Sequence, residues 1–164
     1  MNKILVFITL IAFCIVSGCS KNESVDKEFF MTWKANGVDF KAATIKANYY
    51  SRFRELKIEA TAGKDFNLDG ITFDLFDFTT TSPTILGNGE ALYLGNCLLD
   101  RYWTRDTNPG ILTVTKFNDS ENIIEGEFSF EALGNTAYFD NCNTTKRTKV
   151  SVTNGKFRIK YDKQ

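Results

Sequence analysis

The chain has 164 residues, and its 20 lysines and arginines are balanced by 20 aspartates and glutamates, so the net charge is zero. A hydrophobic fraction of 43% is typical of a globular domain and excludes collagen-like, coiled-coil and disordered chains. Without an excess of positive charge, a nucleic-acid binder is not expected. The chain contains no histidine, which excludes Ser-His-Asp and Cys-His catalysis and histidine-ligated zinc.

The N-terminus has the organisation of a signal peptide. A short positive segment precedes an apolar stretch, residues 4–16, which is too short to span a bilayer comfortably. The stretch ends in Val16-Ser17-Gly18-Cys19, which resembles the bacterial lipobox, in which the cysteine is lipid-modified and becomes the new N-terminus. We expect residues 1–18 to be a lipoprotein signal peptide, 19–29 a flexible tether and 30–164 a single all-β domain.

Lipidation of Cys19 predicts where the protein resides. Several acyl chains such as palmitate would hold it stably on a membrane, because a single chain binds only marginally. Ser20 is not the aspartate that retains enterobacterial lipoproteins in the inner membrane, so by analogy we expect the outer membrane, with the domain facing the periplasm or the cell surface. The expected partners are this membrane and an unidentified protein, glycan or small ligand, and no cofactor is expected.

The four cysteines have different predicted fates. Cys14 leaves with the leader and Cys19 is the lipidation site, so Cys97 and Cys142 remain in an oxidising compartment. We expect these two to form a disulfide, which would stabilise the fold by about 4 kcal/mol at most through loop-closure entropy. They do not form the C-x-x-C arrangement of a redox pair, and two thiols without histidine make a poor metal site.

From residue 31 onward, apolar and polar residues alternate in short segments separated by turn residues, the pattern of antiparallel strands with one covered face. Leu56, Ile58 and Ala60, for example, alternate with charged residues. We expect strands at residues 31–35, 38–49, 54–62, 70–77, 91–97, 111–117, 123–132, 148–153 and 156–161.

Two Asn-Gly pairs predict β-hairpins, since this dipeptide suits the type I′ turn. At Asn36-Gly37 the turn would place Ala35 opposite Val38 and Trp33 opposite Phe40. At Asn154-Gly155 it would place Val152 opposite Phe157 and Val150 opposite Ile159.

The expected fold is therefore an antiparallel meander of about nine strands that forms a β-sandwich or a flattened barrel. The alternative is a lipocalin-like closed barrel, in which the 15 phenylalanines of the chain would line a cavity. Inward phenylalanines that touch one another would indicate the sandwich or flattened barrel, whereas phenylalanines that surround an empty volume would indicate the closed barrel.

Several motifs resemble a family of small uncharacterised Bacteroidota lipoproteins. They are a strand ending in Thr115-Lys116-Phe117, the strand Gly126-Glu127-Phe128-Ser129-Phe130 and the segment Thr153-Asn154-Gly155-Lys156-Phe157. The segment Asn36 to Phe40 is similar to the N-terminal hairpin of that family. The resemblance implies an all-β lipoprotein and supplies no activity, cofactor or catalytic residue.

Two groups of acidic residues have simpler explanations than a site. Asp65, Asn67 and Asp69 match the first half of a calcium loop, but Phe76 stands where the bidentate glutamate should be, so plain turn chemistry is favoured. Glu125, Glu127 and Glu131 share one side of a strand, where such charges usually serve solubility and edge protection.

The best candidate for recognition is the segment from Leu99 to Asn108, predicted to be a loop. Aromatic and arginine side chains on a loop rim commonly contact partners, and this segment holds four of them: Arg101, Tyr102, Trp103 and Arg105. The alternative is that one aromatic ring is buried and the arginines pair with Asp100 and Asp106. A second cluster, Tyr49 to Arg54, is expected at a strand end and turn.

These features favour a non-enzymatic binding or interaction module on the outer membrane. The alternative function is that of a lipocalin-like carrier of a small apolar ligand, which requires an internal cavity. A carboxylate-dependent hydrolase is a more distant possibility, because alternation places Asp74 and Asp77 on opposite faces.

Replacing Cys19 by alanine tests the anchor. We expect the wild-type protein to enter the detergent phase, and the Cys19→Ala variant to be soluble or to remain an unprocessed precursor. Mass spectrometry of the N-terminus reports the lipid directly. A mature, unacylated N-terminus elsewhere in the chain would contradict the prediction.

Overall fold

The computed structural model describes residues 28–63, 69–80, 83–95, 100–134 and 148–164, and within these ranges the protein is all-β, as predicted. No helix among these residues is long and apolar enough to cross a membrane. The strands are β1 (Phe30–Ala35), β2 (Val38–Lys41), β3 (Thr44–Tyr50), β4 (Glu55–Ala62), β5 (Asp69–Leu75), β6 (Thr84–Leu86), β7 (Ala91–Leu94), β8 (Arg101–Trp103), β9 (Gly110–Asn118), β10 (Ile123–Gly134), β11 (Lys149–Lys160) and β12 (Asp162–Lys163).

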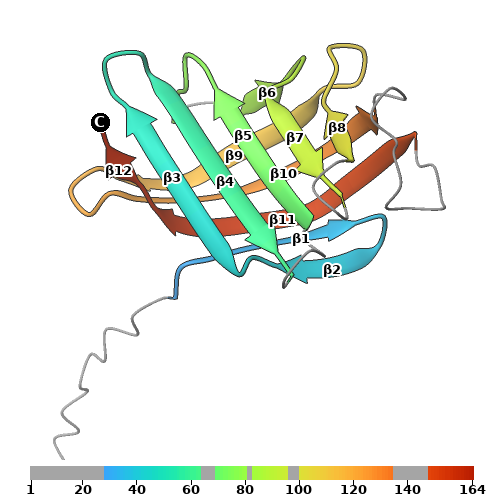
Figure 1. Ribbon diagram of the computed structural model, residues 1–164. Helices are drawn as coiled ribbons and strands as arrows, with labels where there is room; N and C mark the ends of the chain where they lie inside the picture. The colour runs from blue at the N-terminus through green and yellow to red at the C-terminus, as the bar shows by residue number, and fades with distance from the viewer. Residues whose placement is uncertain (1–27, 64–68, 81–82, 96–99, 135–147) are drawn as a thin grey trace, which may run out of the picture.

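The strands form one sheet that curls over on itself (Figure 1). Its order is β12-β3-β4-β5-β7-β8-β10-β11-β1-β2, with β9 paired to β10 and β6 paired to β9. The layer containing β3, β4, β5 and β7 thereby lies over the layer containing β1, β11, β10 and β9. The chain changes layer after β2, where the Ala42 amide donates to Met31 of β1 and the Ala43 amide donates to Thr61 of β4, at 2.8 and 2.7 Å.

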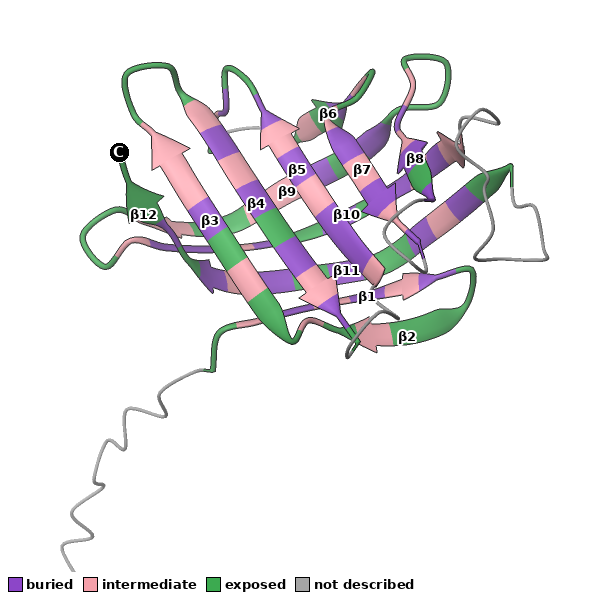
Figure 2. Cartoon of the chain, in the orientation of Figure 1, coloured by how far each residue is buried: buried purple, intermediate pink, exposed green. Residues whose placement is uncertain are grey.

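The two layers enclose a core of alternate residues. Leu56, Ile58 and Ala60 are all buried on β4, which confirms the predicted dry face, and buried and accessible bands alternate along the strands in Figure 2. Phe73 of β5 meets Phe128 and Phe130 of β10 across the core, with ring centres 4.9 and 5.9 Å apart. The inward phenylalanines thus touch one another between the layers.

The first Asn-Gly pair forms the predicted hairpin between β1 and β2. Asn36 and Gly37 have φ of 49° and 85°, the two positive values that a type I′ turn requires. Trp33 lies opposite Phe40 as expected, and their rings stack with centres 5.6 Å apart.

The second Asn-Gly pair does not form a hairpin, and that prediction is wrong. Asn154 and Gly155 lie inside β11, which continues through them and pairs with β1 on one side and β10 on the other. Asn154 has a φ of 53°, but Gly155 does not adopt the second positive φ of a type I′ turn. The register shifts here against both neighbouring strands, which identifies a one-residue β-bulge.

The bulge explains the change of parity that suggested a turn. Thr153 and Asn154 are consecutive exposed residues, so Val150 and Val152 before them and Phe157 and Ile159 after them all face the core. The sequence correctly predicted which of these side chains lie inside, but not how the backbone brings them there.

Glycines allow aromatic rings to lie close to the backbone of neighbouring strands. A Cβ atom at Gly155 would be 2.4 Å from the ring of Phe128, its partner on β10, and one at Gly126 would be 2.5 Å from the ring of Phe157, its partner on β11. Such ring-over-glycine pairs fill the space that a glycine leaves in a sheet.

Other differences concern short or interrupted strands. The predicted strand 38–49 is divided at residues 42–43, where the chain changes layer. The predicted strand 91–97 ends at Leu94, and residues 96 and 97 lie outside the described residues. Strands β6, β8 and β12 were not predicted, because two or three residues are too few to show an alternating pattern.

We expect Gly155→Ala to lower the free energy of unfolding by about 2 kcal/mol, because the added methyl group overpacks the site against Phe128. Chemical denaturation measures the loss. The control is Thr153→Ala, an exposed position on the same strand, for which a change within about 0.5 kcal/mol is expected. Equal stability of the two variants would show that the ring contact does not constrain β11.

Candidate ligand-binding face

Strand β8 holds three of the four residues predicted for recognition, so the prediction of a loop is wrong over Arg101–Trp103. The strand pairs with β7 and β10. Tyr102 is only 2% exposed, and its ring centre lies 6.1 Å from that of Tyr93 in the core. Of the two adjacent aromatic residues, Tyr102 is therefore the buried one.

Alternation places the other three predicted residues on the outer face. Arg101 is exposed, while Trp103 and Arg105 are half-buried, and buried residues lie between them. Trp103 is directly opposite Leu92 of β7 and Leu133 of β10, and directly opposite residues share a face. The outer face of β8 thus presents an indole bordered by two leucines.

Hydrogen bonds fix the corner between β8 and β9. The Thr104 hydroxyl, which is fully buried, donates to the Gly87 carbonyl and accepts from the Ala91 amide, the latter at 3.1 Å. Arg105 donates to the side-chain oxygen of Asn88 at 3.2 Å. The Asp106 carboxylate, which the alternative interpretation paired with the arginines, accepts a hydrogen bond from the Asn88 amide at 2.8 Å. This corner is a hydrogen-bonded structure that holds the outer face of β8 in place.

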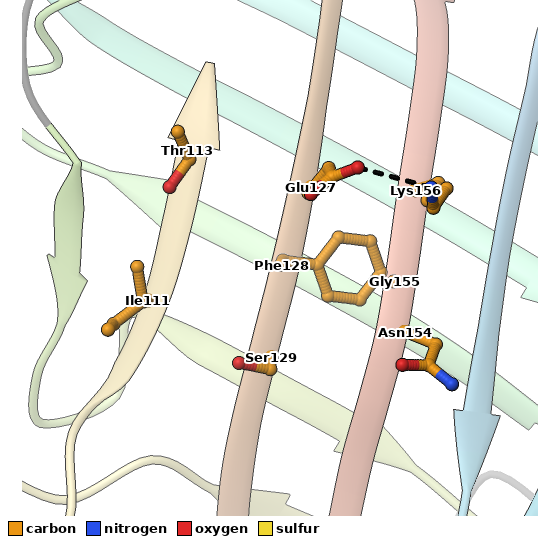
Figure 3. A pocket seen from close by; sticks show the side chains of 8 residues that line it. All are labelled: Ile111, Thr113, Glu127, Phe128, Ser129, Asn154, Gly155 and Lys156. Carbon is orange, nitrogen blue, oxygen red and sulfur yellow. Dashed lines mark ion pairs between the residues drawn. The ribbon is translucent and has the colours of Figure 1, made fainter. Parts of the chain in front are cut away.

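A hollow of about 430 Å³ lies on the outer face of β9, β10 and β11 (Figure 3). Its lining side chains are those of Ile111, Thr113, Glu127, Phe128, Ser129, Asn154 and Lys156, together with the backbone of Gly155. A second hollow of about 250 Å³ shares Ile111 and Ser129 with it and reaches Ser151 and Thr153. The two hollows form one shallow depression beside the bulge.

Small side chains make the floor of this depression, and ion pairs stand at its sides. Ser129 lies between Ile111 on β9 and the bulge on β11. Glu127 pairs with Lys156 at 3.2 Å on one side. On the other side Glu131 pairs with Lys149 at 2.8 Å and accepts a hydrogen bond from Asn108 at 2.9 Å.

The charges on this face are balanced. The Lys149 ammonium group donates to Glu131 and lowers the pKa of that carboxyl, and the Asn108 amide acts in the same direction. Glu125, the next outward carboxylate along β10, pairs with Arg158. Hydroxyl groups, one amide and paired charges can form hydrogen bonds to a polar ligand, and Ile111 offers an apolar contact.

The structure describes only some of the other residues that the sequence singled out. Cys19, Cys97, Cys142, Asp65, Asn67 and Leu99 lie outside the described residues. Asp69, the third member of the possible calcium loop, accepts a hydrogen bond from the Tyr93 hydroxyl at 2.8 Å. In the described ranges no three acidic, cysteine or histidine residues are placed to hold a metal ion.

The chain matches no family model, and no curated protein or solved structure is significantly similar to it. The resemblance to Bacteroidota lipoproteins therefore rests on the sequence motifs alone and stays a prediction.

The depression beside the bulge was not predicted from the sequence. Its residues come from three strands, so no single segment identifies it. One signal was present: serine and threonine occupy the outward positions 113, 129, 151 and 153, whereas longer charged residues occupy the outward positions farther along the same strands.

Replacing Lys149 by methionine tests the electrostatics of this face. The pKa of Glu131 lies below its ordinary value of 4.5 because Lys149 donates to it, so in the Lys149→Met variant this pKa should rise toward 4.5. A lowered folded-state pKa means that the pair stabilises the fold above the unfolded-state pKa, and that this contribution is lost as pH falls through the folded-state value. Carboxyl titration by NMR measures the shift, with Lys46→Met on β3 as a control that leaves it unchanged.

Proposed function

We propose that the protein is a lipid-anchored binding module of the outer membrane that holds an extended polar ligand, without chemical conversion, along the outer face of β8 to β11. The observation that carries the proposal is that the phenylalanines of the two layers contact each other inside, whereas the depression lies outside. A carrier of apolar molecules requires internal space, so the packing of Phe73 against Phe128 and Phe130 favours surface binding over the lipocalin-like alternative.

The dimensions of the face favour an extended ligand. The outward residues of β10 run from Glu127 through Ser129 and Glu131 to Leu133, which is about 20 Å at the rise of a β-strand. The depression lies at the Ser129 end of this line, and Trp103 lies beside Leu133 at the other. Several sugar units or several residues of an extended peptide would cover this length.

The pairing of the carboxylates supports binding without catalysis. Glycoside hydrolysis by a carboxylate pair needs one free acid and one free base around the bond to be cleaved. On this face Glu125, Glu127 and Glu131 each form an ion pair with a lysine or arginine, so none of the three carboxylates is a free acid or base. These residues can orient a ligand by hydrogen bonds.

Blocking the depression tests the proposal. Binding of the purified protein is measured on an array of bacterial-envelope oligosaccharides and extended peptides, and the best probe is then titrated. We expect Ser129→Tyr to weaken its binding at least tenfold, because the larger side chain fills the depression. Thr72→Tyr places the same side chain on the outer face of β5 and should bind as the wild type does.

Two results would contradict the proposal. One is equal binding of the probe by the wild type and the Ser129→Tyr variant. The other is displacement of the probe by a fatty acid together with loss of phenylalanine packing in NMR spectra, which would support the carrier alternative.

A further inference from the structure

Two phenylalanines protrude from neighbouring turns at one end of the curled sheet. Phe53 lies in the turn between β3 and β4 and is 65% exposed, and Phe76 follows β5 and is 62% exposed. The Arg52 guanidinium lies 5.7 Å from the centre of the Phe53 ring. We call Arg52, Phe53, Arg54 and Phe76 the aromatic tip.

The two turns are joined to each other. The Phe78 amide donates to the Arg54 carbonyl at 2.7 Å, and the Arg54 side chain donates to the Asp77 carbonyl at 3.3 Å. Arg54 and Asp77 both have positive φ, 52° and 50°, which is uncommon for residues other than glycine. Residues in such conformations persist only where surrounding contacts impose them.

A buried aromatic cluster supports the tip from below. Phe78 is 4% exposed and packs edge to face against Tyr49, with ring centres 6.2 Å apart. Tyr49 in turn contacts Phe117 and Tyr161 at 6.1 and 5.8 Å. The exposed rings of Phe53 and Phe76 are thus held outward on a supported end of the fold.

We propose that the aromatic tip contacts the surface of the lipid bilayer that holds the Cys19 lipid, with Phe53 and Phe76 in the boundary between headgroups and acyl chains. This inference rests on the proposed lipid anchor. Exposed aromatic rings on a soluble domain bury apolar area when they enter that boundary, and arginine stems can lie along it with the charged groups among the lipid phosphates. Asp77 and Glu55 lie near the arginines and offset their positive charge. Burial of the phenylalanine rings, and not a net positive charge, would therefore stabilise the contact with the bilayer.

The length of the tether permits this orientation. Eight residues lie between Cys19 and Glu28, so nine residue-to-residue steps join them, and a fully extended chain of nine steps spans about 32 Å at most. The distance from the start of the domain to the tip can be followed through paired strands. Phe30 at the start of β1 pairs with Arg158 of β11, and β11 continues into β12. Strand β12 pairs with Asn48 and Tyr49 of β3, just before the tip. This path measures about 30 Å at ordinary strand spacing. The anchor can therefore be inserted while the tip touches the same bilayer.

Fluorescence quenching by the bilayer tests the inference on the full lipidated chain. The protein is reconstituted in phosphatidylcholine vesicles with brominated acyl chains, and tryptophan is introduced at the tip by Phe53→Trp or Phe76→Trp. The control is Ile85→Trp, because Ile85 is also exposed, at 55%, but lies on β6, which pairs with β9 and is not part of the tip. Wild-type protein supplies the background from Trp33 and Trp103.

We expect bromine to quench the added fluorescence at the tip at least twice as strongly as that of Ile85→Trp. Equal quenching at the three positions would overturn the inference, as would a dimer in vesicle-free solution that is abolished by replacing Phe53 and Phe76 with serine. Mass spectrometry of the same sample reports the lipid, so a lipidated protein without tip quenching contradicts this inference alone. An unlipidated N-terminus contradicts the proposed anchor instead.

Discussion

The structure depends on one extra residue in the strand that lies between β10 and β1. The side chains of a strand alternate between faces, so β11 without its bulge would turn either Val150 and Val152 or Phe157 and Ile159 toward solvent. The bulge at Asn154 keeps both halves facing the core, and β11 can then remain paired along its length with both neighbours. It also places Asn154 and Gly155 at the depression on the outer face. The same backbone irregularity completes the core and shapes the surface that we propose binds a ligand.

The filling of the interior follows from where glycine and phenylalanine meet. At Gly155 and Gly126 the absence of a side chain lets the rings of Phe128 and Phe157 lie close to the neighbouring strand. Phe73 then reaches Phe128 from the opposite layer. Aromatic residues that could have lined a cavity instead contact one another between the layers, so a binding site on the outside of the sheet is favoured. The balanced ion pairs there suit recognition by hydrogen bonds, since each carboxylate is paired with a lysine or arginine and is not free for acid or base chemistry.

Local patterns in the sequence predicted the all-β fold, most long strands and the first hairpin, because alternation and a type I′ turn depend on a few adjacent residues. The two Asn-Gly pairs show where such reasoning stops. Asn36-Gly37 connects two strands that pair with each other. At Asn154-Gly155 the strand instead continues, because β11 pairs on both sides of the bulge with β1 and β10, which lie elsewhere in the sequence. The prediction that Leu99 to Asn108 forms a loop was wrong over Arg101–Trp103 for a similar reason. Its aromatic residues and arginines suggested a loop, but pairing with β7 and β10 makes Arg101–Trp103 a strand and sends Tyr102 into the core.

The proposed anchor and the proposed binding face place different demands on one small domain, and the topology separates them. The aromatic tip is formed by turns at the ends of β3, β4 and β5, in one layer of the sheet, whereas the depression lies on the outside of β9, β10 and β11 in the other layer (Figure 1). With the tip on the bilayer, the strands of the second layer would stand beside the membrane with their outer face open to solvent. A ligand could then lie along β10 without displacing the domain from the lipid. Contact at the tip would also limit rotation about the tether, so the face would be presented in a restricted range of directions, which lowers the entropy lost on binding.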